Sequence, residues 1–401
     1  MSKRNIRRVV LTASVIAGLV RAGHAQEETF CQSQQDLANQ YLGSIPSVGL
    51  SMVTLKLGEP PCFMRRGEIK KNSGVAPDAN TVFELASVTK VFTTAILAMH
   101  QRQQALYVWG PVQPYLPPNY KLLSDESTVT FQQLATFTGG FYWSDPPGFT
   151  KGTSFSQKDF ETAVNNLIPP KKDNAIPGTI DLPTYYNYSN GSVGFLGQIL
   201  MHMDSSKGTS YSFDPTGFSN WISAFVTGPL GMNNTAVEPK GVWATGYNAA
   251  GASQDPFLWE PWGAAGALRS TTNDMLKFLK ANICAHHTTD PNCSSIPLNI
   301  LQALETAHEA NQYNPAGSLA DPTIYVNQAN GVEQAWAWQY HAPPVPNPNN
   351  VTPILSKNGG HAGFSSVIAF NPDKSYGLVI LVNQHVKGLT AAGIQIIRHT
   401  K

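Results

Sequence analysis

Two residues three positions apart have side chains that together can cleave an acyl bond. Ser87 and Lys90 follow Phe83–Ala86 and begin a segment whose apolar residues have helical spacing. On a helix, positions i and i+3 share one face, so we expect both side chains to lie about a turn apart. A lysine amine can take the proton of a serine hydroxyl only when burial or a nearby positive charge lowers its pKa. The pair predicts nucleophilic catalysis, although Ser-x-x-Lys also arises by chance in a chain of 401 residues.

A tyrosine motif offers a second candidate base. Tyr188-Ser189-Asn190 precedes a Gly-containing run that continues into an expected helix. Near two ammonium groups, a phenolate can act as a general base at neutral pH, and the Asn190 amide can bind a substrate carbonyl and hold Lys90 in place. The segment 185–187 has the same Tyr-x-Asn spacing, and Tyr188 is preferred to Tyr185 because a helix is expected after it. The alternative is that this segment serves only loop and core packing.

A lysine followed by small residues forms the third motif. Lys357, Asn358, Gly359 and Gly360 precede the expected strand 366–370. The lysine supplies a positive charge for a substrate carboxylate, and glycines on a strand edge let a substrate backbone approach closely. The backbone N–H of Gly360 is expected to form an oxyanion hole together with that of the serine. The alternative is an ordinary Gly-rich turn before a strand.

The elements that must position these residues indicate an α+β fold. Period-two patterns, typical of strands, occur near both ends of the chain, and helical patterns lie between them. The expected strands are 49–55, 62–67, 366–370 and 377–382, and the expected helices are 26–45, 83–101, 159–167, 271–279 and 389–398. We therefore expect one antiparallel sheet flanked by helices, with a mostly helical lobe inserted. The sheet lobe is expected over about 26–105 and 265–401, and the helical lobe over about 106–264.

Residues 1–25 have the layout of a secretory signal peptide. Four basic residues precede an apolar run of 12 residues, and small residues follow as far as Ala25. A membrane anchor is the alternative, but spanning a bilayer takes ~20 residues. We expect cleavage after Ala25, a single large domain over 26–401 with no membrane span, and a periplasmic or secreted protein.

Composition limits the partners. Charged residues are 13% of the chain, about half the usual ~25%, and no basic run occurs outside the N-terminus. Removal of residues 1–25 takes away five of the 27 basic residues and no acidic one, which leaves 22 basic against 26 acidic residues. The sequence thus indicates a small-molecule substrate and no nucleic acid. We expect a monomer without cofactor or metal.

Four cysteines in an exported chain favour disulfides. Cys284 and Cys293 enclose a polar loop and form a natural pair, which leaves Cys31 with Cys62. Three pairings are possible for four cysteines, so this is one of three alternatives. A metal site that uses the histidines at 286 and 287 is the rival interpretation, but no third and fourth ligand occurs at the usual zinc spacing.

The three motifs resemble those of class C β-lactamases and their relatives, the serine D-alanyl-D-alanine peptidases and β-lactamase-like carboxylesterases. Phe83–Lys90 is similar to the nucleophile segment, 188–190 to the Tyr-Ala-Asn box and 357–359 to Lys-Thr-Gly. This resemblance implies a β-lactamase that opens β-lactam rings through an acyl-enzyme on Ser87. The alternatives are a carboxylesterase or D-alanyl-D-alanine peptidase of the same fold, or a non-enzymatic penicillin-binding module.

The resemblance also implies a role for each residue. Lys90 and Tyr188 would share acid–base work, Asn190 would contact the substrate amide, and Lys357 would orient a carboxylate. Deacylation would use water activated near Tyr188, because no glutamate is placed as in class A enzymes.

Several positions depart from the family pattern. Asn358 stands where the family has threonine, residues 139–145 lack the family's glutamine, and 180–186 form an insert before the tyrosine motif. His361 gives a His-x-Gly box like that of some esterase relatives, but the spacing to Gly363 favours Lys357 in this place. These departures bear on whether the substrate is a β-lactam or an ester.

Overall fold

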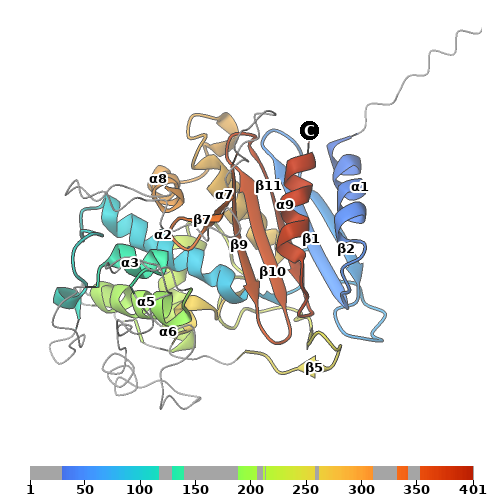
Figure 1. The fold of residues 1–401 in the computed structure, drawn as a ribbon, viewed down its shortest axis with the longest axis horizontal. Helices are drawn as coiled ribbons and strands as arrows, with labels where there is room; N and C mark the ends of the chain where they lie inside the picture. The colour runs from blue at the N-terminus through green and yellow to red at the C-terminus, as the bar shows by residue number, and fades with distance from the viewer. Residues whose placement is uncertain are drawn as a thin grey trace, which may run out of the picture.

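A seven-stranded antiparallel sheet forms the centre of the protein in a computed structural model (Figure 1). The structure describes residues 29–116, 129–139, 188–205, 211–212, 214–257, 262–309, 332–341 and 353–400. The strand order is β2-β1-β11-β10-β9-β8-β7. The strands are β1 (Gly49–Lys56), β2 (Cys62–Gly67), β7 (Val332–Gln334), β8 (Gln339–His341), β9 (Ile354–Gly360), β10 (Ser365–Asn371) and β11 (Tyr376–Val382). The expected α+β architecture, with an antiparallel sheet built from both ends of the chain, is confirmed.

The central strands are buried on both faces. In β11, Leu378 and Ile380 pack into one apolar cluster, and Val379 and Leu381 pack into another on the opposite face. Successive side chains of a strand point to opposite faces, so a continuous apolar run fits a strand with helices on both sides. The same alternation holds in β1 and β10.

Helices cover each face of the sheet. On one face, α1 (Phe30–Leu42) and α9 (Leu389–His399) lie side by side (Figure 1). On the other, α7 (Thr272–Cys284) packs against β1, β10 and β11, with α2 (Thr89–Arg102) and α8 (Leu298–His308) behind it. The sheet is thus the middle layer of three, and one apolar cluster fills each interface.

The middle of the described chain contributes mostly helices. These are α3 (Phe131–Thr136), α5 (Asn190–Ser205) and α6 (Pro215–Ile222), with the short turns η2 (Gln113–Tyr115) and η4 (Ser223–Thr227), the latter π-helical. The short strands are β3 (Phe83–Glu84), β4 (Gly246–Tyr247), β5 (Ser253–Gln254) and β6 (Arg269–Ser270), and the remaining short helical turns are η1 (Ala86–Val88), η5 (Gly263–Ala265) and η6 (Pro291–Cys293). The expected helix 159–167 lies outside the described residues. The division into two lobes stays a prediction.

The expected helix over 83–101 is wrong at its beginning. Residues 83–84 form β3, which pairs with β6, and the 3-10 turn η1 leads into α2 only at Thr89. Ala86 has a left-handed φ of 46°, which no α-helix allows. Periodicity alone could not locate this turn, because apolar residues continue through strand, turn and helix.

Two disulfides are present, between Cys31 and Cys62 and between Cys284 and Cys293, so the expected pairing is confirmed. The first ties α1 to the edge strand β2. His287 contacts the Pro372 carbonyl and the Ser375 hydroxyl. No helix in the part of the chain that the structure describes is long and apolar enough to cross a membrane.

Candidate active site

The nucleophile turn brings Ser87 and Lys90 into contact. Ser87 lies in η1, Lys90 in the first turn of α2, and the Lys90 Nζ is 3.0 Å from the Ser87 Oγ. The backbone of Leu268 holds this turn in place. Its N–H donates to the Thr89 hydroxyl, and its carbonyl accepts from the Leu85 N–H. The serine and its candidate base therefore belong to one anchored unit.

Lys90 is fully buried with a complete set of oxygen partners. Its Nζ lies 2.7 Å from the Asn190 Oδ1 and 2.8 Å from the Ala265 carbonyl, besides the serine hydroxyl. Burial, followed by the nearby charge of Lys357, lowers the pKa of Lys90 well below its usual value. A neutral amine has two N–H bonds, which the two carbonyl oxygens can accept, and its lone pair then faces the Ser87 hydroxyl. This geometry suits a general base.

Tyr188 lies between the two lysines, just before α5. Its ring centroid is 5.0 Å from the Lys90 Nζ and 4.8 Å from the Lys357 Nζ, and the latter also approaches the Tyr188 hydroxyl to 3.5 Å. Phe137 packs against the ring at 4.7 Å between centroids. The start of α5 is stabilised by the Ser189 hydroxyl, which accepts from the Ser192 N–H at 3.0 Å. The helix start thereby places Tyr188 and Asn190 on either side of this cap.

β9 supplies the third part of the site. Lys357 and Gly359 are buried, whereas Asn358 and Gly360 are exposed. Burial lowers the pKa of Lys357 to about 7. A cavity of about 270 Å³ runs alongside this end of β9 and is lined by the two exposed residues together with Lys387. Lys357 therefore lies on the face of β9 that meets Tyr188, and Asn358 lies on the face that lines this cavity.

Gly359 sets the distance between β9 and the nucleophile turn. Any side chain at this position would collide with the Leu85 carbonyl and the Ser366 hydroxyl. The Ser366 Oγ donates to the same Leu85 carbonyl at 2.7 Å. Absence of a side chain thus lets the strand lie directly against the segment that carries Ser87.

The Ala265 carbonyl is a partner of Lys90 that the sequence did not reveal. It lies in η5, which packs closely on α5. This close packing requires glycine at 194 and 197, because a side chain there would collide with Trp262 or Ala264. The residue type at a position does not reveal what its backbone carbonyl will contact. The small residues on α5 were the one available hint, since they permit close approach of another segment.

The structure brings together Ser87, Lys90, Tyr188, Asn190 and Lys357 from three separate segments. The alternative Tyr185, the loop 140–145 and the insert 180–186 lie outside the described residues. Asn358 lines the cavity beside β9, and its expected contact with a carboxylate stays a prediction.

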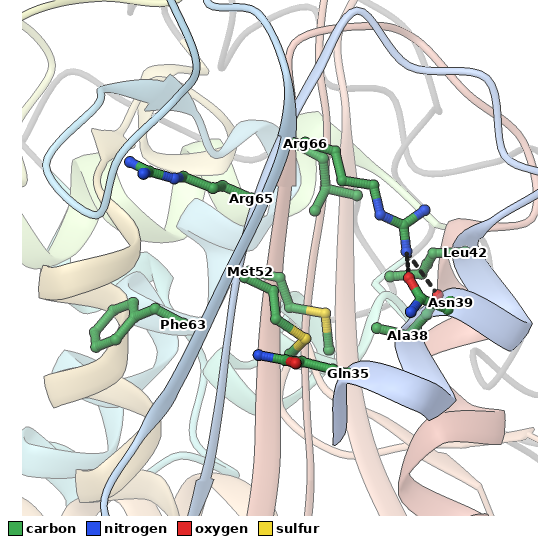
Figure 2. Close-up of a pocket in the computed structure, with 10 residues that line it drawn as sticks. Gln35, Ala38, Asn39, Leu42, Met52, Phe63, Arg65 and Arg66 are labelled. Atoms are coloured by element: carbon green, nitrogen blue, oxygen red, sulfur yellow. Dashed lines mark hydrogen bonds between the residues drawn. The ribbon is translucent and has the colours of Figure 1, made fainter. Parts of the chain in front are cut away.

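A further cavity, of about 330 Å³, lies between α1 and β2, four strands away from β9 (Figure 2). Met52 and Leu42 line it, and the Arg66 guanidinium donates to the Ala38 carbonyl and the Asn39 side chain. Its lining holds no serine, lysine or histidine.

Comparisons with known proteins show which family and fold the chain shares. A family model described as Beta-lactamase matches residues 62–399. The D-alanyl-D-alanine-carboxypeptidase/endopeptidase AmpH of Escherichia coli K12 is 24% identical over 388 residues, which are 94% of this chain and 92% of that protein. A beta-lactamase of Lysobacter lactamgenus is 25% identical over 329 residues, covering 77% of this chain and 75% of that protein.

Solved structures share the fold. A Beta-Lactamase/D-Alanine Carboxypeptidase from Pseudomonas syringae matches with a TM-score of 0.69 at 20% identity, over 93% of this chain and 99% of that one. A class C beta-lactamase matches with a TM-score of 0.71 at 19% identity, over 94% and 99%. The fold is that of the β-lactamases and transpeptidases, and the family match extends over most of the sequence. The chain belongs to the beta-lactamase family.

Proposed function

We propose that the protein is an exported serine β-lactamase of the class C type, which opens β-lactam rings through an acyl-enzyme on Ser87. The observation that carries this proposal is the Lys90 Nζ, fully buried and 3.0 Å from the Ser87 Oγ. A buried amine with a lowered pKa can take the serine proton without a histidine. The two disulfides support export, because such bonds persist in oxidising compartments.

The contacts of Lys90 support the following acylation step. The neutral Lys90 takes the proton as the Ser87 Oγ attacks the ring carbonyl, and the developing oxyanion is stabilised by the N–H groups of Ser87 and Gly360. Asn190 and the Ala265 carbonyl hold the resulting ammonium. The proton then passes to the ring nitrogen as the amide bond breaks, with Tyr188 positioned between the two lysines to share the transfer.

A second candidate is hydrolysis of D-alanyl-D-alanine peptides or simple esters by the same nucleophile. The exposed Asn358 favours it, because an amide there replaces a threonine hydroxyl of the β-lactamases and has a different reach. The relatives also include a D-alanyl-D-alanine carboxypeptidase/endopeptidase.

One substrate panel separates these activities. Initial rates with nitrocefin, p-nitrophenyl acetate and a D-alanyl-D-alanine peptide are compared for the wild type and Ser87→Ala. The β-lactamase proposal expects nitrocefin turnover that the variant lacks, and equal nitrocefin rates for both proteins would overturn it. Turnover of the ester or peptide alone would favour the second candidate. Intact mass after incubation with penicillin detects a long-lived adduct, which would indicate a binding protein.

A further inference from the structure

The nucleophile turn and β9 are both next to a cluster formed by Glu84, His361, Phe257 and Arg269. Glu84 lies three residues before Ser87, and His361 directly follows Gly360. The His361 Nδ1–H donates to the Glu84 Oε2 at 3.0 Å, across 277 positions of sequence. This hydrogen bond is therefore a direct link between the two segments that carry the oxyanion donors.

The Glu84 carboxylate is fixed by further contacts. Its Oε1 accepts from the Phe257 N–H at 2.7 Å and from the Arg269 guanidinium at 3.3 Å. Burial alone would raise the pKa of Glu84, but the hydrogen bond and charge of His361, with the charge of Arg269 and the Phe257 N–H, outweigh it and lower the pKa. The carboxylate is ionised at neutral pH and almost fully buried, so it is a rigid acceptor.

The His361 ring is held on each side. It stacks on Phe257 with 4.2 Å between centroids and 16° between planes. Its Nε2 edge lies over Gly266, where an added methyl carbon would be 3.3 Å away. Gly266 follows Ala265, whose carbonyl contacts Lys90. The His361 backbone is also fixed, because its carbonyl accepts from the His385 Nδ1 at 3.0 Å.

We propose that His361 is a positioning residue for the reaction at Ser87, and that its hydrogen bond to Glu84 holds the Gly360 amide in register with the nucleophile turn. The inference rests on the proposed serine hydrolase function. Oxyanion donors act only within hydrogen-bond distance of the developing charge, and a displacement of about 1 Å can slow a reaction about 100-fold. His361 thus affects the transition state without contacting substrate.

Three variants test this role. His361→Ala removes the hydrogen bond, whereas His361→Asn keeps an N–H donor close to the position of Nδ1. Glu84→Gln keeps an acceptor and loses the charge. The matched control is His287→Ala, a half-buried histidine with two hydrogen bonds near the turn after β10, at the opposite end of that strand from Gly360.

The expected result is a loss in kcat rather than in KM. For His361→Ala, kcat with the substrate that the wild type turns over should fall about 10- to 100-fold, with KM changed less than about threefold. His361→Asn should recover most of the lost kcat, and the kcat of Glu84→Gln should lie between those of the alanine and asparagine variants. The kcat of the control should match that of the wild type. A kcat for His361→Ala within twofold of wild type, or an asparagine variant no better than alanine, would overturn the proposal.

A tetrahedral adduct distinguishes positioning from plain destabilisation. Phenylboronic acid forms such an adduct with an active serine, so its Ki should rise in His361→Ala by the same factor as kcat/KM falls. A lower melting temperature with an unchanged Ki would show a merely structural role. If the wild type turns over no substrate, the proposed function fails. The rate at which a fluorophosphonate modifies Ser87 in each variant then decides the present inference separately.

Discussion

At the scale of single residues, burial changes what a lysine can do. Lys90 and Lys357 are both almost completely buried, and burial lowers the pKa of each. Their surroundings differ, because Lys90 faces the serine hydroxyl and two carbonyl oxygens, whereas Lys357 lies on β9 beside Tyr188. We therefore propose that one residue type supplies a base at position 90 and a charge for substrate binding at position 357.

The proposed role of Lys90 as a base predicts that a permanent cation cannot replace it. Lys90→Ala should slow acylation by about 10²–10⁴-fold. Lys90→Arg should be equally slow, because a guanidinium keeps the charge but does not release its proton in the accessible pH range. Stopped-flow nitrocefin bursts measure the acylation rate, and near wild-type acylation by the arginine variant would contradict the role.

The pKa of Lys357 predicts a charge-dependent pH profile. With a pKa of about 7, Lys357 is an ammonium below this pH and a neutral amine above it. As the pH rises through 7, a substrate carboxylate loses its attraction and KM for an anionic β-lactam should rise. For the uncharged p-nitrophenyl acetate, KM should not follow this curve. KM is measured for both substrates from pH 5 to 9. The same pH dependence for the two substrates would exclude a role of Lys357 in binding the substrate carboxylate.

At the scale of elements, the site depends on how closely β9 lies against the nucleophile turn. Gly359→Ala should move the strand away from Leu85, because the added methyl group collides with this carbonyl. A loss of about 100-fold in kcat/KM is expected from such a displacement. Ser366→Ala removes the hydroxyl that donates to the same carbonyl, but it adds no bulk. Its loss in kcat/KM should therefore be smaller. Equal activity of Gly359→Ala and wild type would contradict this packing.

The elements also show where sequence patterns suffice. The strands β1, β2, β10 and β11 were predictable because short apolar runs bounded by turn residues are typical of strands. The motifs carrying Ser87, Tyr188 and Lys357 were visible because side-chain chemistry marks them. The beginning of α2, the Ala265 carbonyl and the bond between Glu84 and His361 were not visible, since they arise from backbone conformation and from contacts between distant segments.

At the scale of the whole molecule, the disulfides and the site are separate. The bond between Cys31 and Cys62 closes a loop of 31 residues and joins α1 to β2, at the far edge of the sheet from Lys357. The double variant Cys31→Ser, Cys62→Ser should lose about 3–4 kcal/mol of unfolding free energy. Urea unfolding measures this loss, and kcat/KM at 25 °C should stay within twofold of wild type. A large fall in activity of the folded variant would show that this edge is coupled to the site.

The pairing of β1 with β11 has a consequence for the order of folding. Leu50 lies opposite Val382, so the two strands meet only after more than 300 intervening residues have been made. Closing so long a loop is slow compared with forming local contacts. A ribosome-bound or truncated chain without β11 would expose the edge of β1 to pairing with other chains. It would also lack β9 if it ended before residue 354, so the serine would be synthesised long before the strand that completes its surroundings. The surroundings of the serine can therefore be complete only after these last strands have been made.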